Sequence, residues 1–169
     1  MSMLGMRWRS GLFTNSGEIS MYKRILVATD GSELSEKAVD SAIGLASQMG
    51  AELFAVKVIH RAPADLWDGS APLLKKALQN AELEKQWAEH AQAIVDAVKA
   101  SAQAKSVKAT ALTVKSDQVA EGVIGAATRN ECDLIVMASH GRRGLSRILL
   151  GSETQHVLTH SHIPVLIVR

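Results

Sequence analysis

Glycine, serine and arginine residues gather in one segment near the end of the chain. The segment contains Gly141, Gly144, Gly151 and Ser152, with Arg142, Arg143 and Arg147 among them. Glycines let backbone N–H groups approach a phosphate, and a helix that begins after the last glycine adds free amides and the positive end of its dipole. A serine hydroxyl can donate to a phosphate oxygen, and guanidinium groups suit two-point phosphate contacts. The spacing therefore predicts a phosphate-binding loop.

A second polar loop, Ala28-Thr29-Asp30-Gly31-Ser32, closes the first apolar run of the chain. In open parallel sheets, ligands bind beyond the carboxyl ends of the strands, at the point where the strand order reverses. The two loops would share one crevice if the strands before them were neighbours. Periodicity alone does not establish that adjacency.

Each loop also has a purely structural interpretation. Glycines between a strand and a helix commonly form turns, and exposed arginines are commonly just solvated. Ser152 followed by Gln155 matches a capping box, which needs no ligand. Asp30 with Glu33 could likewise cap the first helix. On residue types alone, an anion site is the favoured interpretation of the glycine-rich loop.

The elements around these loops alternate between strand and helix. Apolar runs and alternating patterns predict strands at 23–29, 52–60, 107–115, 133–139 and 164–169. Helical periodicity predicts helices at 33–49, 73–104, around 119–127 and at 152–161, and Gly50 is placed to end the first of them. The buried side of the long helix is predicted to carry Leu74, Leu78, Trp87, Ala91, Ile94, Val95 and Val98. Strands separated by helices indicate one doubly wound parallel sheet with helices on both faces.

Composition restricts the class of protein. The 169 residues fit one domain, and 47% hydrophobic with 21% charged residues is ordinary for a globular chain. A net charge of +2 is too small to indicate a nucleic-acid partner. No run is long enough to span a membrane, and residues 1–20 make a poor signal peptide, so we expect a flexible N-terminal extension before a domain at 21–169. The single cysteine, Cys132, excludes an intrachain disulfide and suits a cytoplasmic protein.

From Tyr22 to Arg169 the sequence resembles the universal stress protein family. The similarity is carried by KRILVATDGSELSEKAVDSA and by DLIVMASHGRRGLSRILLGSETQHVLTHSHIPVLIVR. The nucleotide-binding branch of that family has the pattern G-x2-G-x9-G-[ST]. Here the pattern is Ala138-x2-Gly141-x9-Gly151-Ser152, which departs from it only at the first position. An alanine there is tolerated at negative φ and excluded at positive φ.

The resemblance implies a five-stranded parallel sheet of order 3-2-1-4-5, in which the first and fourth strands are neighbours. It also implies an adenine nucleotide, ATP or AMP, as the ligand. The implied binding residues are Ala28, Thr29, Asp30, Val58, Met137, Ala138, His140, Gly141, Arg142, Arg143, Gly144, Gly151, Ser152, Glu153 and Thr154. Asp30 would repel phosphate unless it met the ribose or shared a Mg²⁺ or Mn²⁺ ion with the nucleotide.

Three functions fit these residues. The favoured one is a dimeric stress-response switch that binds a nucleotide and reports to an unknown protein partner. The second is a slow ATPase or autophosphorylating enzyme, for which His140 is the nearest candidate base and no Walker lysine motif is present. The third is a structural dimer without nucleotide. The family commonly dimerises through its last strand, here 164–169, which ends a sheet and leaves an edge to be paired.

Three histidines near the C-terminus and the single cysteine are further candidates for chemistry. His156, His160 and His162 include an i,i+4 pair that could hold zinc, but no acidic partner is spaced in the sequence to complete the site. Cys132 begins an apolar strand and is predicted to be a small buried hydrophobe, not a reactive thiol.

Overall fold

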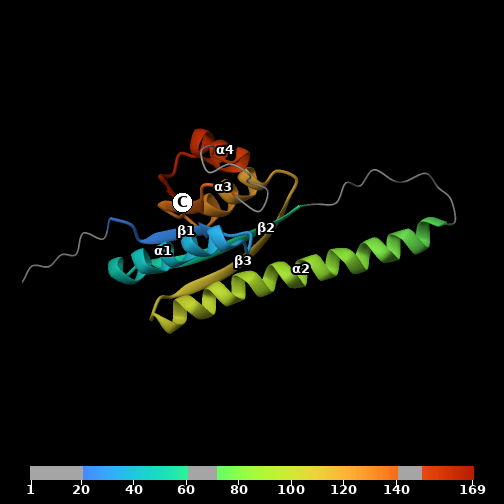
Figure 1. Ribbon diagram of the computed structural model, residues 1–169, viewed down its shortest axis with the longest axis horizontal. Coiled ribbons are helices and arrows are strands. Elements are labelled where there is room, and N and C mark those ends of the chain that lie inside the picture. Colours follow the sequence, from blue (N-terminus) through green and yellow to red (C-terminus); the bar gives the residue numbers. More distant parts are fainter. Residues whose placement is uncertain (1–20, 61–71, 141–149) are drawn as a thin grey trace, which may run out of the picture.

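The fold is that of a computed structural model, which describes residues 21–60, 72–140 and 150–169 (Figure 1). In chain order its elements are β1 (Arg24–Ala28), α1 (Glu33–Met49), β2 (Glu52–His60), α2 (Pro72–Ala104), β3 (Ala109–Ser116), α3 (Val119–Arg129), β4 (Leu134–Ala138), α4 (Ser152–His160) and β5 (Val165–Val168). Every predicted strand and helix is present, with ends displaced by one or two residues. The predicted extension, residues 1–20, lies outside the described residues.

The five strands form one parallel sheet of order β3-β2-β1-β4-β5, as predicted. The first and fourth strands are neighbours, with Leu26 opposite Ile135. The loops that follow them therefore leave the sheet side by side. This is the adjacency that periodicity could not supply.

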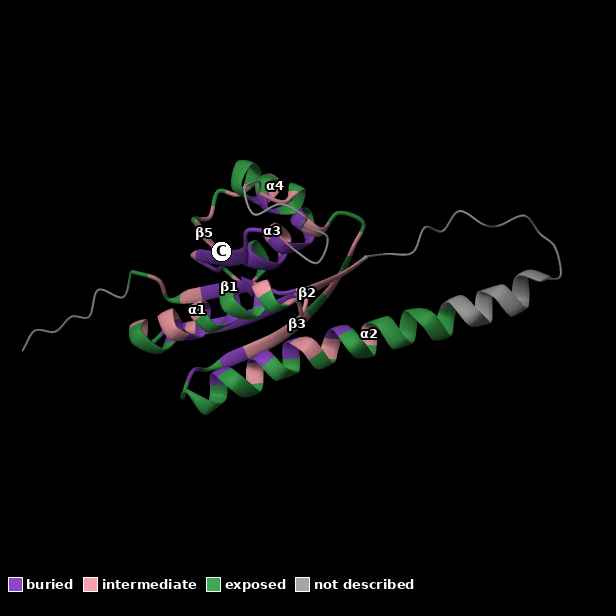
Figure 2. Cartoon of the chain, in the orientation of Figure 1, coloured by how far each residue is buried: buried purple, intermediate pink, exposed green. Residues whose placement is uncertain are grey.

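Side chains of successive strand residues point to opposite faces of the sheet, and each face has its own core. Ile25 and Val27 pack with α1 and the C-terminal half of α2, whereas Leu26 packs with α3 and α4. The buried residues form continuous layers on both sides of the strands (Figure 2). All five residues of β4 are buried, as a central strand covered on both faces requires.

Helix α2 extends far beyond the sheet that it covers (Figure 1). Its 33 residues span about 50 Å, whereas the nine residues of β2 span about 30 Å. Ala91, Val95 and Val98 are buried as predicted, but Trp87 is 50% exposed, so its predicted burial is wrong. The helical period correctly gives the face on which Trp87 lies, but not where the sheet beneath that face ends. The side chains of Leu74 and Leu78 lie outside the described part.

The capping residues differ from the sequence-based alternatives. Ser32 caps α1 by accepting the Ser35 amide, while the Asp30 carboxylate accepts the Ser32 amide at 3.0 Å. Asp30 is therefore not the cap. Gly151 is the N-cap of α4 and Ser152 is its first helical residue, so the capping-box interpretation of Ser152 is wrong as well. The predicted C-cap is confirmed: Gly50 ends α1 with a φ of 63°.

Among the strands that the structure describes, β5 lies at the edge of the sheet and pairs only with β4. Its burial is partial, and Leu166 is 38% exposed. The apolar sequence VLIV therefore lies at an incompletely covered edge of the sheet. Within the described ranges, none of the helices combines the length and apolar character needed to cross a membrane.

Cys132 is buried, as predicted, with 5% of its surface exposed. Burial raises the pKa of this thiol from 9.0 to about 12, since a thiolate would lose its hydration there. We expect the native protein to react with a thiol reagent much more slowly than the urea-unfolded chain, even at pH 10. In the unfolded chain the thiol ionises near pH 9.0, whereas in the folded protein its pKa is about 12. The stability that the buried, neutral thiol contributes is therefore present below pH 9.0 and is lost as the pH rises from there toward about 12. Equal labelling rates in the native and unfolded states would contradict this assignment.

Candidate functional site

A cleft of about 750 Å³ opens at the carboxyl ends of the central strands. Its lining comes from the ends of β1, β2 and β4, the N-termini of α3 and α4, and one turn of α2. The loops after β1 and β4 meet in this cleft because their strands are neighbours. The position agrees with the rule that open α/β sheets bind ligands where the strand order reverses.

The N-terminus of α4 faces the cleft without a side-chain cap. Gly151, the N-cap, has no side chain, and Gly151, Ser152, Glu153 and Thr154 all line the cleft. The amides of the first helical turn have no partner within the helix. Together with the positive end of the helix dipole, they make a site for an anion.

Gly151 is required for a close approach and not for an unusual backbone angle. Its φ is −63°, which any residue can adopt. However, a Cβ at this position would lie 3.3 Å from both the Cα and the Cβ of His140. The Gly151 amide donates to the Ser139 carbonyl at 2.9 Å, which fixes the start of α4 against the end of β4. The glycine therefore sets the distance between these two segments.

The departure from the family pattern at Ala138 causes no backbone strain. Ala138 is the last residue of β4, and it is not among the described non-glycine residues with positive φ. Its methyl group is 8% exposed and packs in the core on the α1 face. The Ala138 carbonyl accepts the hydroxyl of Thr154 at 3.1 Å, so the amide of Thr154, and not its hydroxyl, remains for a ligand.

The β1–α1 loop is held in place by its own polar groups. The Thr29 hydroxyl lies 3.0 Å from that of Ser35 and accepts the Gly31 amide at 3.1 Å. Lys57 of β2 donates from Nζ to the Asp30 carbonyl at 3.2 Å. Lys57 and Asp30 both line the cleft, so its wall carries a cation and a carboxylate that ribose and phosphate groups could meet.

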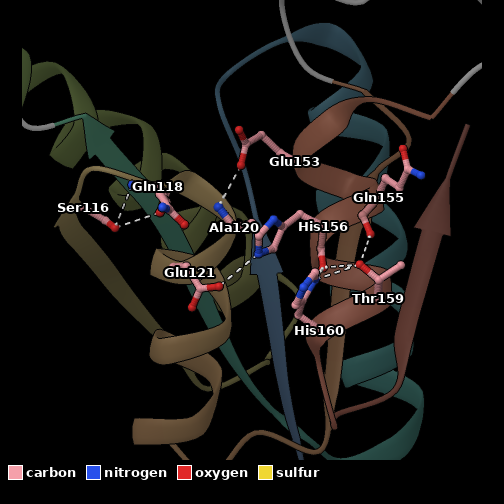
Figure 3. Close-up of polar contacts among 9 residues, drawn as sticks. All are labelled: Ser116, Gln118, Ala120, Glu121, Glu153, Gln155, His156, Thr159 and His160. Atoms are coloured by element: carbon pink, nitrogen blue, oxygen red, sulfur yellow. Dashed lines mark hydrogen bonds and ion pairs between the residues drawn. The ribbon is translucent and has the colours of Figure 1, made fainter.

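Two contacts join α3 and α4 (Figure 3). The Glu153 carboxylate accepts the Ala120 amide at 2.9 Å and so provides the α3 N-terminus with an acceptor, since Gln118 makes no side-chain cap. His156 Nε2 lies 3.0 Å from Glu121 Oε1. Glu153 therefore positions the α4 N-terminus through its carboxylate, while its amide is one of those in the first turn of the helix.

His156 and His160, two of the three histidines considered for zinc, lie on α4 and already make other contacts (Figure 3), whereas His162 follows the end of that helix. His156 and His160 stack with ring centroids 4.1 Å apart, and His160 Nδ1 lies 2.8 Å from the Thr159 hydroxyl. Glu121 is an acidic neighbour of His156 that sequence spacing did not reveal. Within the described ranges, no three His, Cys, Asp or Glu side chains are grouped to hold a metal ion.

Gly122 on α3 controls the position of Val58, one of the predicted binding residues that line the cleft. A Cβ on Gly122 would lie 3.0 Å from both methyl groups of Val58 and 3.1 Å from Cβ of Ser116. Carbon atoms normally pack at about 3.5–4.0 Å. The glycine therefore lets α3 lie directly against this wall of the cleft.

The cleft brings together most of the predicted site residues. The predicted residues that line it are Ala28, Thr29, Asp30, Val58, Met137, Ala138, His140, Gly151, Ser152, Glu153 and Thr154. Gly141, Arg142, Arg143 and Gly144 lie outside the described residues. The sequence-based prediction missed Lys57, a charge inside the apolar run LFAVKVI, and also Trp87 and His90 of α2. Lys57 could have been found from that break in the apolar pattern, whereas no sequence signal placed α2 at the cleft.

Comparison with known proteins decides the family. The model of the Universal stress protein family matches residues 21–169. The chain belongs to the universal stress protein family. The universal stress protein MJ0531 of Methanocaldococcus jannaschii is 33% identical over 156 residues, which cover 89% of this chain and 84% of that protein.

Solved structures of universal stress proteins share the fold. MJ0577 of Methanocaldococcus jannaschii has a TM-score of 0.72 at 29% identity, with 88% of this chain and 96% of that one covered. A universal stress protein solved in complex with cAMP has a TM-score of 0.60 at 25% identity, covering 88% and 97%. That relative thus binds an adenine nucleotide.

Proposed function

We propose that this universal stress protein binds an adenine nucleotide, ATP or AMP, in the cleft at the carboxyl ends of β1, β2 and β4. The observation that carries the proposal is the uncapped N-terminus of α4, which opens into a cleft of about 750 Å³. The amides of its first turn and the exposed Ser152 hydroxyl would hold the phosphates. The cAMP complex of a relative supports an adenine nucleotide as the ligand class.

The other end of the nucleotide would lie toward β2. Asp30 and Thr29 would meet the ribose, with Val58 beside the base. With ATP, a Mg²⁺ or Mn²⁺ ion could be shared by the Asp30 carboxylate and the phosphate oxygens, since Mg²⁺ commonly combines one carboxylate with substrate phosphates. Gly141 belongs to the same proposed phosphate loop by its place in the family pattern, and Arg142, Arg143 and Gly144 belong to it because they follow Gly141 directly in the sequence.

A binding switch is favoured over an enzyme. Phosphoryl transfer needs a positioned base or nucleophile. His140 lines the cleft. However, its Nδ1 lies 3.0 Å from the hydroxyl of Ser139, which is the residue just before it in the sequence. The test is to denature the purified protein, identify any released nucleotide, and incubate fresh protein with ATP and Mg²⁺. Bound and intact ATP supports the switch; steady ADP release that Asp30→Ala abolishes would favour the ATPase.

We further propose that the protein forms a homodimer through the edge strand β5. This dimer would be the form that a partner protein in the cytoplasm recognises. Leu166→Lys places a charge on the half-exposed edge and is expected to convert the dimer to a monomer in light scattering after gel filtration. Leu158→Lys is the matched control, because Leu158 is 39% exposed on α4, almost the same as Leu166 at 38%. A monomeric parent protein, or a Leu166→Lys variant that remains dimeric, would rule out this interface.

A further inference from the structure

One wall of the cleft comes from helix α2, which no feature of the sequence placed there. Trp87, His90 and Ala91 line the cleft. They are spaced i, i+3 and i+4, so they lie on one stripe of the helix. Ala91 is 2% exposed, which shows that this stripe faces inward. Trp87 lies one turn earlier, where the helix leaves the sheet, and is 50% exposed.

The α2 wall and Val58 approach the cleft from opposite faces of the sheet. Val58 packs with the core on the α3 side and lies against Gly122. The C-terminal half of α2 packs with the core on the α1 side. A flat group lying over the end of β2 would therefore have an aliphatic side chain on one side and an indole on the other.

The sheet order indicates which part of a nucleotide would reach this place. The phosphate site is at the start of α4, which follows β4, and β2 is two strands away across β1. Two strand spacings are about 10 Å. With its phosphates at α4, a mononucleotide extending across β1 would bring its base to the end of β2.

We propose that Trp87 stacks on the purine base of the bound nucleotide, opposite Val58. This inference rests on the proposed function, because it takes the phosphates to lie at the α4 N-terminus. The large π-face of a purine gains more from such stacking than a pyrimidine does. Trp87 would then favour purine over pyrimidine nucleotides without separating adenine from guanine.

The test combines affinity with fluorescence. Trp87→Ala is expected to weaken ATP binding about tenfold in calorimetry, the size of one lost stacking contact, whereas Trp87→Phe keeps most of the affinity. Inorganic tripolyphosphate, used as a probe without a base, should bind both variants like the parent. Leu83→Ala is the control, since Leu83 is a similarly exposed apolar residue of α2, 45% exposed, that does not line the cleft.

A second readout uses the intact Trp87 side chain. The chain has three tryptophans, so Trp8→Phe with Trp67→Phe leaves Trp87 as the only one, whose emission is followed with excitation selective for tryptophan. ATP should change its emission and tripolyphosphate should not. The stacking proposal is overturned if the parent and Trp87→Ala bind ATP equally well, or if the Trp87 emission does not change when ATP binds. In either case the proposed function stands. If the parent binds no ATP, both fail.

Discussion

Replacing Gly151 with valine is expected to weaken ATP binding on the order of 100-fold. A Cβ at this position already lies 3.3 Å from the backbone of His140, and the branched methyl groups of valine add further crowding. The start of α4 must then move away from β4, which misaligns the amides that we propose for the phosphates. Losing two charge-assisted hydrogen bonds at the low end of their usual range, about 1.5 kcal/mol each, gives an effect of this size. Isothermal titration with ATP measures it.

Ser152→Ala is the graded control for this result. It removes one hydroxyl but leaves the amides and the backbone path in place, so we expect roughly tenfold weaker binding. Circular dichroism should show that both variants remain folded. A Gly151→Val protein that binds ATP within about threefold of the parent would mean that the phosphates do not lie at the α4 N-terminus.

Gly122→Ala is expected to lower the free energy of unfolding by about 0.5–2 kcal/mol, because an overpacking cost of about 1–3 kcal/mol exceeds the gain of about 0.5–1 kcal/mol from the better helix propensity of alanine. The added methyl group would lie 3.0 Å from both Val58 methyl groups, so α3 must shift or Val58 must turn. Urea denaturation followed by circular dichroism measures the change through its midpoint. Because Val58 forms a wall of the cleft, ATP affinity should fall as well.

Gly44→Ala is the matched control on α1. Nothing lies within 4 Å of a Cβ placed there, so the variant should be more stable by about 0.5–1 kcal/mol, through the better helix propensity of alanine. The two glycine-to-alanine changes should thus have opposite signs. If both stabilise the protein, the contact of α3 with β2 is looser than described.

Periodicity and residue type predicted the elements of this fold well, because each signal is local. The strand LIVM of β4 and the helical repeat of α1 can be recognised without knowing their neighbours. Strand order was different: it depended on the resemblance to the family, since no local pattern tells whether β1 and β4 pair. Most of the candidate site followed once those two strands were adjacent.

The wrong predictions depend on the positions of neighbouring elements, which a local sequence pattern does not specify. Trp87 has the correct helical phase but lies beyond the end of the sheet. Ser152 resembles a helix cap, yet α4 begins one residue earlier than that interpretation requires. Contacts such as that of the Glu153 carboxylate with the Ala120 amide join residues far apart in sequence, so only the folded chain reveals them.

The central claim is that the cleft above β1, β2 and β4 holds an adenine nucleotide. Titrating the full-length protein with ATP in a calorimeter, after any co-purified nucleotide has been removed, tests it most directly. We predict saturable binding of one ATP per chain, with AMP competing for the same site and Gly151→Val abolishing most of the heat. Absence of binding for both ATP and AMP to the folded protein would contradict the account and leave the structural dimer as the better explanation of this chain.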